Sequence, residues 1–195
     1  MKLNWVEKMI VKSPVRGLVQ HHVEGKKLLR MGGAAYGDIL EIGCGHGIGV
    51  DVIQRVFNGQ SIDAVDLDED MVSLAQKRHA SNPQVRVMQA DICKIKEQDK
   101  RYDCIFNFAV LHHVPNWQMA VENMYAILNP SGKFYIEEFY KRLICNPIIN
   151  KIVEHPQENR FDHQMLIDQL EHVGFEVTAH TNLFNCIGLV VAQKK

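Results

Sequence analysis

The sequence predicts an α/β fold in which helices cover both faces of a mostly parallel sheet. Short apolar runs alternate with helical stretches along most of the chain, as a parallel sheet with crossover helices requires. A glycine-rich turn follows the first apolar run. The last two runs are joined by only four residues, which predicts an antiparallel hairpin near the carboxyl end.

Four apolar runs in the first half of the chain are predicted strands. They are GDILEIG (37–43), SIDAVDL (61–67), VRVMQAD (85–91) and YDCIFNF (102–108). One helix is predicted from Ile48 to Phe57 and a charged one from Asp68 to about Ala80. Helices therefore join the first three strands, and a short polar link leads to the fourth.

The second half continues the alternation. Apolar residues at helical spacing in NWQMAVENMYAIL (116–128) stop at a predicted turn, residues 129–132, which leads into the strand KFYIEEF (133–139). A helix at HQMLIDQLEHVG (163–174) closes at a glycine. The hairpin strands are FEVTAHT (175–181) and CIGLVVAQ (186–193).

The 195 residues have the length of one domain, and we expect four parts within it. Residues 1–33 would form a helical cap, residues 37–139 the core, and residues 163–195 the terminal helix and hairpin. Residues 140–162 are a candidate substrate lid, or alternatively a surface helix packed on the sheet. In the lid, the apolar side chains of Ile144, Ile148, Ile149 and Ile152 would line an acceptor pocket. The cationic side chains of Lys141, Arg142, His155 and Arg160 would reach an anionic group.

Charge and cysteine usage narrow the function classes. A net charge of −1 gives no global indication of nucleic-acid binding. The first thirty residues are basic, which indicates a solvated helix face or, alternatively, a surface that contacts anionic lipid or a phosphorylated substrate. The five cysteines form no CxxC pair, and no apolar run approaches the roughly 20 residues of a membrane span. The expectation is a cytoplasmic protein without a metal site.

The stretch DILEIGCGHGIGV (38–50) places bare backbone directly after a buried strand. In a doubly wound sheet this turn lets a ligand approach the main chain. The dinucleotide fingerprint GxGxxG fails in every register, because Ile48, Val50 or Val52 occupies the position of the third glycine. Glu41 precedes the first glycine, where it would repel a diphosphate and attract a positively charged ligand group.

The segment EIGCGHG (41–47) resembles the first motif of the class I S-adenosylmethionine-dependent methyltransferases. Later motifs of that family follow in order, at AVDLDEDMV (64–72), QADI (89–92), YDCIFNFAVLHHV (102–114) and LNPSGKFYIEE (128–138). The resemblance implies a Rossmann-like sheet of seven strands in the order 3-2-1-4-5-7-6 with strand 7 antiparallel. It also implies S-adenosylmethionine as cofactor and S-adenosylhomocysteine as product. LHHV and LNPSGKF are most similar to the small-molecule branch that includes ubiquinone and menaquinone biosynthesis methyltransferases.

The resemblance assigns expected roles to the cofactor residues. Asp66 closes the second strand, where its carboxylate would accept from both ribose hydroxyls. Asp91 would accept from the adenine amino group, or would only begin a turn. Glu41 and the backbone carbonyl of Phe108 would bind the ammonium group. The remaining contacts are expected from Gly43, Cys44, Gly45 and Gly47 along the methionine and ribose, from Leu67 and Met71 around adenine, and from the backbone of Ile92; the Cys44 thiol is expected to pack rather than react.

The catalytic residues are less clearly marked. Methyl transfer to an aligned acceptor needs a base only where the acceptor keeps a proton at neutral pH. His112, in the HisHis pair after the fourth strand, is one candidate base, although the resemblance implies an architectural role for that pair. Glu138, which leaves the fifth strand on the opposite face from Glu137, is the second candidate.

The expected function is methyl transfer to oxygen, carbon or nitrogen of a small-molecule acceptor. The fourth strand ends in NFAV (107–110) and not in an Asn-Pro-Pro-aromatic loop, so we expect no DNA substrate. The alternatives are an RNA or protein methyltransferase with the same core, and a catalytically silent module that binds S-adenosylmethionine. The free edge of the terminal hairpin is a candidate pairing surface for a second copy.

Overall fold

The computed structural model describes residues 23–95, 100–146 and 158–195. A seven-stranded sheet runs through it in the order β3-β2-β1-β4-β5-β7-β6, which confirms the predicted topology. The strands are β1 (Asp38–Ile42), β2 (Ser61–Asp66), β3 (Val85–Gln89), β4 (Tyr102–Phe108), β5 (Leu128–Phe139), β6 (Phe175–Leu183) and β7 (Ile187–Lys194). The first five pair in parallel, and β7 lies antiparallel to both β5 and β6.

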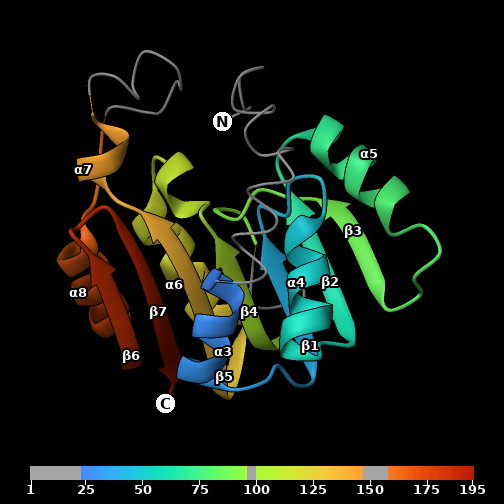
Figure 1. The fold of residues 1–195 in the computed structure, drawn as a ribbon, viewed down its shortest axis with the longest axis horizontal. Coiled ribbons are helices and arrows are strands. Elements are labelled where there is room, and N and C mark those ends of the chain that lie inside the picture. The colour runs from blue at the N-terminus through green and yellow to red at the C-terminus, as the bar shows by residue number, and fades with distance from the viewer. Residues whose placement is uncertain (1–22, 96–99, 147–157) are drawn as a thin grey trace.

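Helices cover both faces of the sheet (Figure 1). They are α3 (Gly25–Gly32), α4 (Ile48–Phe57), α5 (Glu69–Arg78), the short 3-10 helix η2 (Leu111–His113), α6 (Trp117–Ile127), α7 (Lys141–Ile144) and α8 (His163–Val173). Residues 1–22 of the predicted cap and 147–157 of the predicted lid, including Ile148, Ile149, Ile152 and His155, lie outside the described residues. No described helix has the length and apolar character that a membrane crossing needs.

Alternate residues of the strands build two separate cores. Leu40 and Ile42 of β1 pack in a cluster with α6 and α8, whereas Ile39 packs on the other face with α3 and α4. On β5, Phe134 belongs to the first cluster and Tyr135 to the second. The period of two along each strand sends successive side chains to opposite faces, and both faces are covered, so the strands read as continuous apolar runs.

Helix ends follow local sequence signals. The Asp68 side chain accepts a hydrogen bond from the Asp70 backbone N–H at 3.0 Å and so caps the start of α5. The Asp162 carboxylate caps α8 in the same way, through the Met165 N–H at 3.1 Å. Gly174, at φ +113°, ends α8 in the left-handed conformation.

The turn predicted at residues 129–132 lies inside β5 as an irregularity of its pairing with β4. Tyr102 pairs with Leu128, but Cys104 already pairs with Lys133, so the chain inserts extra residues between the two pairs. The Asn129 amide donates to Asp103 Oδ1 at 2.8 Å, and Ser131 takes a positive φ of +63°. The side-chain contact stabilises a bulge where the sequence pattern indicates a chain reversal.

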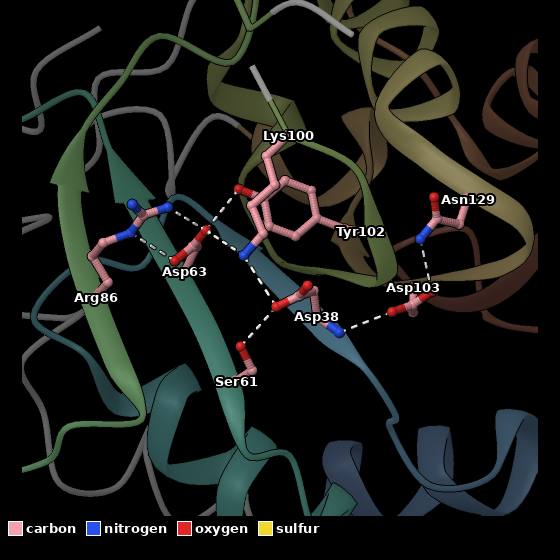
Figure 2. Close-up of polar contacts among 8 residues, drawn as sticks. All are labelled: Asp38, Ser61, Asp63, Arg86, Lys100, Tyr102, Asp103 and Asn129. Atoms are coloured by element: carbon pink, nitrogen blue, oxygen red, sulfur yellow. Dashed lines mark hydrogen bonds and ion pairs between the residues drawn. The ribbon is translucent and has the colours of Figure 1, made fainter. Parts of the chain in front are cut away.

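A cluster of charged side chains lies where the parallel strands begin, at the opposite edge of the sheet from the glycine-rich turn (Figure 2). Asp63 is 5% exposed and accepts hydrogen bonds from Arg86, Lys100 and the Tyr102 hydroxyl, with distances from 2.7 to 3.2 Å. Lys100 also reaches Asp38 at 3.1 Å. Burial alone would raise the pKa of Asp63, but these donors outweigh it and hold the pKa below its usual range. The cluster joins β1, β2, β3 and β4 at this edge.

Candidate active site

A cavity of about 490 Å³ opens at the carboxyl ends of β1 to β4, within the size range of small-molecule sites. In a doubly wound sheet this edge is the expected position of a ligand. The cavity is lined by seven residues that the sequence assigns to the cofactor: Gly43, Gly45, Asp66, Leu67, Asp91, Ile92 and Phe108. They come from four different strand ends, and the order of the strands brings them together.

The glycine-rich turn joins β1 to α4. Gly43, Gly45 and Gly47 have φ values of +63°, +53° and +90°, which side chains other than glycine rarely adopt. A Cβ on Gly43 would overlap the side chain of Val110, which also lines the cavity. The turn therefore needs glycine both for its backbone angles and for the close approach of the loop that follows β4.

Cys44 points away from the cavity. Its side chain is buried in the cluster with α3 and α4, and its backbone N–H donates to the Val65 carbonyl at 2.9 Å. Burial strongly raises the pKa of the thiol, so it is held as a neutral packing group. This placement agrees with the expectation that the Cys44 thiol packs rather than reacts.

Asp66 connects the end of β2 to both flanking turns. Its Oδ2 accepts from the Gly45 N–H at 2.8 Å, and its Oδ1 accepts from the Asp68 N–H at 2.9 Å. Burial raises the pKa of the carboxyl, and the two backbone donors act in the opposite direction. The carboxylate is thus held at the cavity wall with its orientation fixed, and its remaining acceptor positions are available to a ligand.

Glu41 lies beneath the turn. It is 2% exposed, does not line the cavity, and its Oε2 is buried without a hydrogen-bond partner in the described chain. A Cβ on Gly49 would overlap Glu41 Oε1, so α4 can begin against this carboxyl only with glycine there. Burial raises the pKa of Glu41 well above its usual range, with Asp66 and Asp51 adding to the effect. A nearby cation would restore its ionised form.

The adenine side of the predicted site is partly organised by local contacts. Asp91 Oδ1 accepts from the Cys93 N–H at 3.0 Å, which is the turn-initiating contact considered as its alternative role. The Ile92 carbonyl accepts from the Asn123 amide at 3.0 Å. Leu67 is 41% exposed in the cavity wall, whereas Met71 of α5 is fully buried and does not line the cavity.

His112 and Glu138, named from the sequence as separate candidates, form one buried unit. The Glu138 carboxylate binds His112 Nδ1 and also accepts from the Phe139 and Leu111 N–H groups and the Asn107 amide. The carboxyl is fully buried and His112 is 5% exposed. Burial raises the pKa of Glu138 to about 8, against the effect of its donors. At neutral pH burial therefore favours the protonated form of the Glu138 carboxyl.

Some residues in this region have no role predicted from the sequence, and others make contacts that differ from the predicted ones. His113, the neighbour of His112, lines the cavity, and the two rings lie 4.1 Å apart between centroids. Asn107 is fully buried and supports Glu138, and an amide inside an otherwise apolar strand was the signal that could have identified it. Lys141 and Arg142, proposed for an anionic group, instead contact Asp162 at 2.6 Å and the Phe184 carbonyl at 3.0 Å.

Known proteins resemble this chain in sequence and fold. A family model described as a methyltransferase domain matches residues 39–132. The chain is 27% identical over 152 residues to a probable S-adenosylmethionine-dependent methyltransferase from Mycolicibacterium smegmatis. The matched region covers 78% of this chain and 57% of that protein. It is 29% identical over 99 residues to a ubiquinone biosynthesis O-methyltransferase from Coxiella burnetii, covering 50% of this chain and 41% of that protein.

A solved structure of an S-adenosylmethionine-dependent methyltransferase from Aquifex aeolicus superposes with a TM-score of 0.75 at 17% identity, over 100% of both chains. At that identity the likeness shows the fold. The chain spans little more than half the length of the first of these curated relatives and less than half of the second.

Proposed function

The chain belongs to the class I S-adenosylmethionine-dependent methyltransferases, and on that premise we propose that it transfers a methyl group to a small-molecule acceptor. The cofactor of the family supplies a methyl group already activated by a positively charged sulfur. The observation that carries the proposal is the Asp66 carboxylate, fixed by the Gly45 and Asp68 N–H groups at the wall of a 490 Å³ cavity. This is the carboxylate on which the resemblance places the ribose.

The residues around the cavity fit S-adenosylmethionine chemically. Asp66 offers acceptors for two hydroxyl groups, and the glycine turn offers bare backbone for close approach. Glu41 offers a buried carboxyl with an unpartnered Oε2, which would bind an ammonium group directly or through water. Leu67 and Ile92 supply apolar surface for the adenine ring.

In the proposed reaction the chain aligns the acceptor and excludes water, since in-line displacement at an activated carbon needs little more. Where the acceptor keeps a proton, the unit of His112 and Glu138 is the proposed proton acceptor. Glu138 orients the imidazole through Nδ1 and stabilises its protonated form, while its own position is fixed by Asn107 and Leu111.

The acceptor is proposed to be small and partly apolar. The cavity wall beyond the cofactor residues includes Val110, Val114 and Met119, which favour an apolar body. The similarity to a ubiquinone biosynthesis O-methyltransferase favours an oxygen acceptor on a lipophilic molecule. Carbon and nitrogen acceptors remain within the same proposed chemistry.

Calorimetric titration with S-adenosylmethionine, S-adenosylhomocysteine and NAD tests the proposal, after mass spectrometry of the purified protein for bound cofactor. We expect micromolar binding of the two adenosyl ligands and none of NAD, followed by acceptor-dependent release of S-adenosylhomocysteine. Absence of binding by either adenosyl ligand would overturn the proposal. Binding without turnover against a broad acceptor panel would support the catalytically silent alternative.

A further inference from the structure

Arg160 lies beside the unit of His112 and Glu138, on the described segment that leads into α8. Its Nη1 donates to the His112 carbonyl at 2.5 Å. The two neighbouring side chains anchor the same segment: Asn159 donates to the Pro115 carbonyl at 2.7 Å, and Phe161 packs on Trp117 with 4.5 Å between ring centroids. Arg160 is therefore attached to the loop whose residues His113 to Asn116 line the cavity.

The other two nitrogens of this guanidinium have no hydrogen-bond partner in the described part of the chain. Nε and Nη2 are both buried, and neither makes a hydrogen bond to the described residues. A buried N–H group left unpaired costs about 1–3 kcal/mol, and more when the group is charged. Nε and Nη2 lie on the same edge of the planar guanidinium, where they form a parallel pair of donors that matches the two oxygens of a carboxylate.

No acidic side chain of the described residues neutralises the charge of Arg160 through an ion pair. Glu138, the nearby acid, is already bound by His112, Asn107, Leu111 and Phe139. The unit of His112 and Glu138 is neutral while it holds one proton, whichever of the two carries it. A partly buried cation, with two buried donors that lack a partner among the described residues and a neutral neighbour, is the arrangement that an anionic ligand completes.

We propose that Arg160 is the anchor for a carboxylate on the methyl acceptor, with Nε and Nη2 as the two donors. The proposal rests on the proposed methyltransferase function and names its substrate class: a small molecule with a carboxylate and a separate nucleophilic atom. The anchored carboxylate is not the methylated group, because two charge-assisted hydrogen bonds hold its lone pairs and lower its nucleophilicity.

The two donors are covered in this structure, so acceptor binding must displace part of their surroundings. Enclosure afterwards excludes water from the new ion pair, which strengthens it.

The test uses minimal carboxylates, which need no knowledge of the full acceptor. Protein saturated with S-adenosylhomocysteine is titrated calorimetrically with acetate, hexanoate and benzoate, and with the three corresponding amides. We expect millimolar binding of at least one carboxylate and about tenfold or greater weakening for its amide. No carboxylate binding up to tens of millimolar, or equal binding of acid and amide, would overturn the proposal.

Two variants of Arg160 and one control variant test whether the preference for a carboxylate over its amide arises at Arg160. Arg160→Met should abolish the preference for the acid, and Arg160→Lys should lose most of it, because lysine keeps the charge but not the paired donors. Arg55→Met, on an exposed arginine of α4, should keep it. An unchanged preference in Arg160→Met would overturn the site, and a full preference in Arg160→Lys would overturn the role of the donor pair.

The outcomes separate this inference from the proposed function. If the wild-type protein binds S-adenosylhomocysteine but shows no Arg160-dependent carboxylate preference, only the anchor fails. If it shows that preference without binding S-adenosylhomocysteine in a parallel titration, the methyltransferase proposal fails and the anion site remains. Arg160→Lys also keeps the test usable where Arg160→Met does not fold.

Discussion

At the scale of single residues, two carboxyl groups carry the proposed chemistry and differ in how they are held. Asp66 accepts two backbone N–H groups at the cavity wall, and Glu138 is enclosed with His112. The first is suited to bind hydroxyl groups, because its position is fixed and part of it faces the cavity. The second is suited to hold and release a proton, because burial opposes its charge.

Asp66→Ala should weaken S-adenosylhomocysteine binding at least about 100-fold, because it removes two charge-assisted hydrogen bonds worth about 1.5–3 kcal/mol each. The fold should persist, with a loss of about 1–3 kcal/mol in unfolding free energy from the Gly45 and Asp68 N–H groups that lose their acceptor. Calorimetry and circular dichroism measure the two effects. A dissociation constant within tenfold of the wild type would contradict the assignment of the ribose site.

Glu138→Gln should change the pH dependence of methyl transfer. Since burial raises the pKa of Glu138 to about 8, the unit with His112 becomes a base only as pH rises through that value, and turnover should rise with it. The variant should lose this rise and turn over about 100-fold more slowly, with S-adenosylhomocysteine affinity unchanged. Glu137→Gln, on the opposite face of β5, should keep the wild-type profile.

The raised pKa of Glu138 also makes the free energy of unfolding depend on pH, so that stability falls as pH rises whereas turnover is expected to increase. A carboxyl whose pKa rises on folding contributes stability below its unfolded pKa of about 4.3, and this contribution is lost as pH rises toward 8. The stability of the wild type relative to Glu138→Gln should therefore fall across that window. Urea denaturation at several pH values measures this, and a difference that is flat with pH would show that Glu138 is not protonated on folding.

At the scale of elements, the turn between β1 and α4 has the strictest sequence requirement. Gly43→Ala places a side chain at φ +63° and against Val110. We expect a loss of about 2–4 kcal/mol in unfolding free energy and at least tenfold weaker S-adenosylhomocysteine binding.

Gly33→Ala is the matched control, because Gly33 also has a positive φ of +80° but no atom lies within 4 Å of its Cβ position. Only the backbone strain remains there, about 1–3 kcal/mol because its ψ of −176° falls in a region that glycine alone commonly adopts, and cofactor binding should be unaffected. Equal effects of the two substitutions on binding would mean that Val110 does not constrain the turn.

At the scale of the whole molecule, stability and binding are placed at opposite edges of the sheet. The cluster around Asp63 lies where the strands begin (Figure 2). The cavity lies where they end. Because the two regions share no residue, substitutions in one should act independently of the other.

Asp63→Asn should lower the unfolding free energy at pH 7 by about 1–3 kcal/mol, since it removes the negative charge and one of the two oxygens that accept from Arg86, Lys100 and Tyr102. The pKa of Asp63 is lowered in the fold, so this stability is present above the unfolded pKa of about 4 and is lost as pH falls further. The unfolding free energies of the wild type and the variant should therefore become equal in acid.

Asp51→Asn removes an exposed ion pair with Arg78 and should cost less than about 1 kcal/mol. Denaturation across pH 3–7 measures both variants, with S-adenosylhomocysteine binding as a second readout. Weakened binding in Asp63→Asn would contradict the separation of the two edges.

The sequence by itself determined the alternation of strands and helices and the position of the cofactor turn, while the strand order was implied by its resemblance to the methyltransferase family. These features depend on signals within a few residues: alternation of apolar runs, glycines at Gly43 and Gly45, and a closing acid at Asp66. Strand-end residues converge wherever parallel strands lie side by side, so an ordered set of motifs was enough to predict the cavity that they line.

Only the tertiary structure decided which distant side chains act together. His112 and Glu138 are 26 residues apart, and their pairing depends on the register of β4 and β5. Arg160 is brought to His112 across 48 residues, and its two unpartnered nitrogens are a property of packing. Burial, protonation and unpaired donors arise from contacts between segments, and no local pattern of residues encodes them.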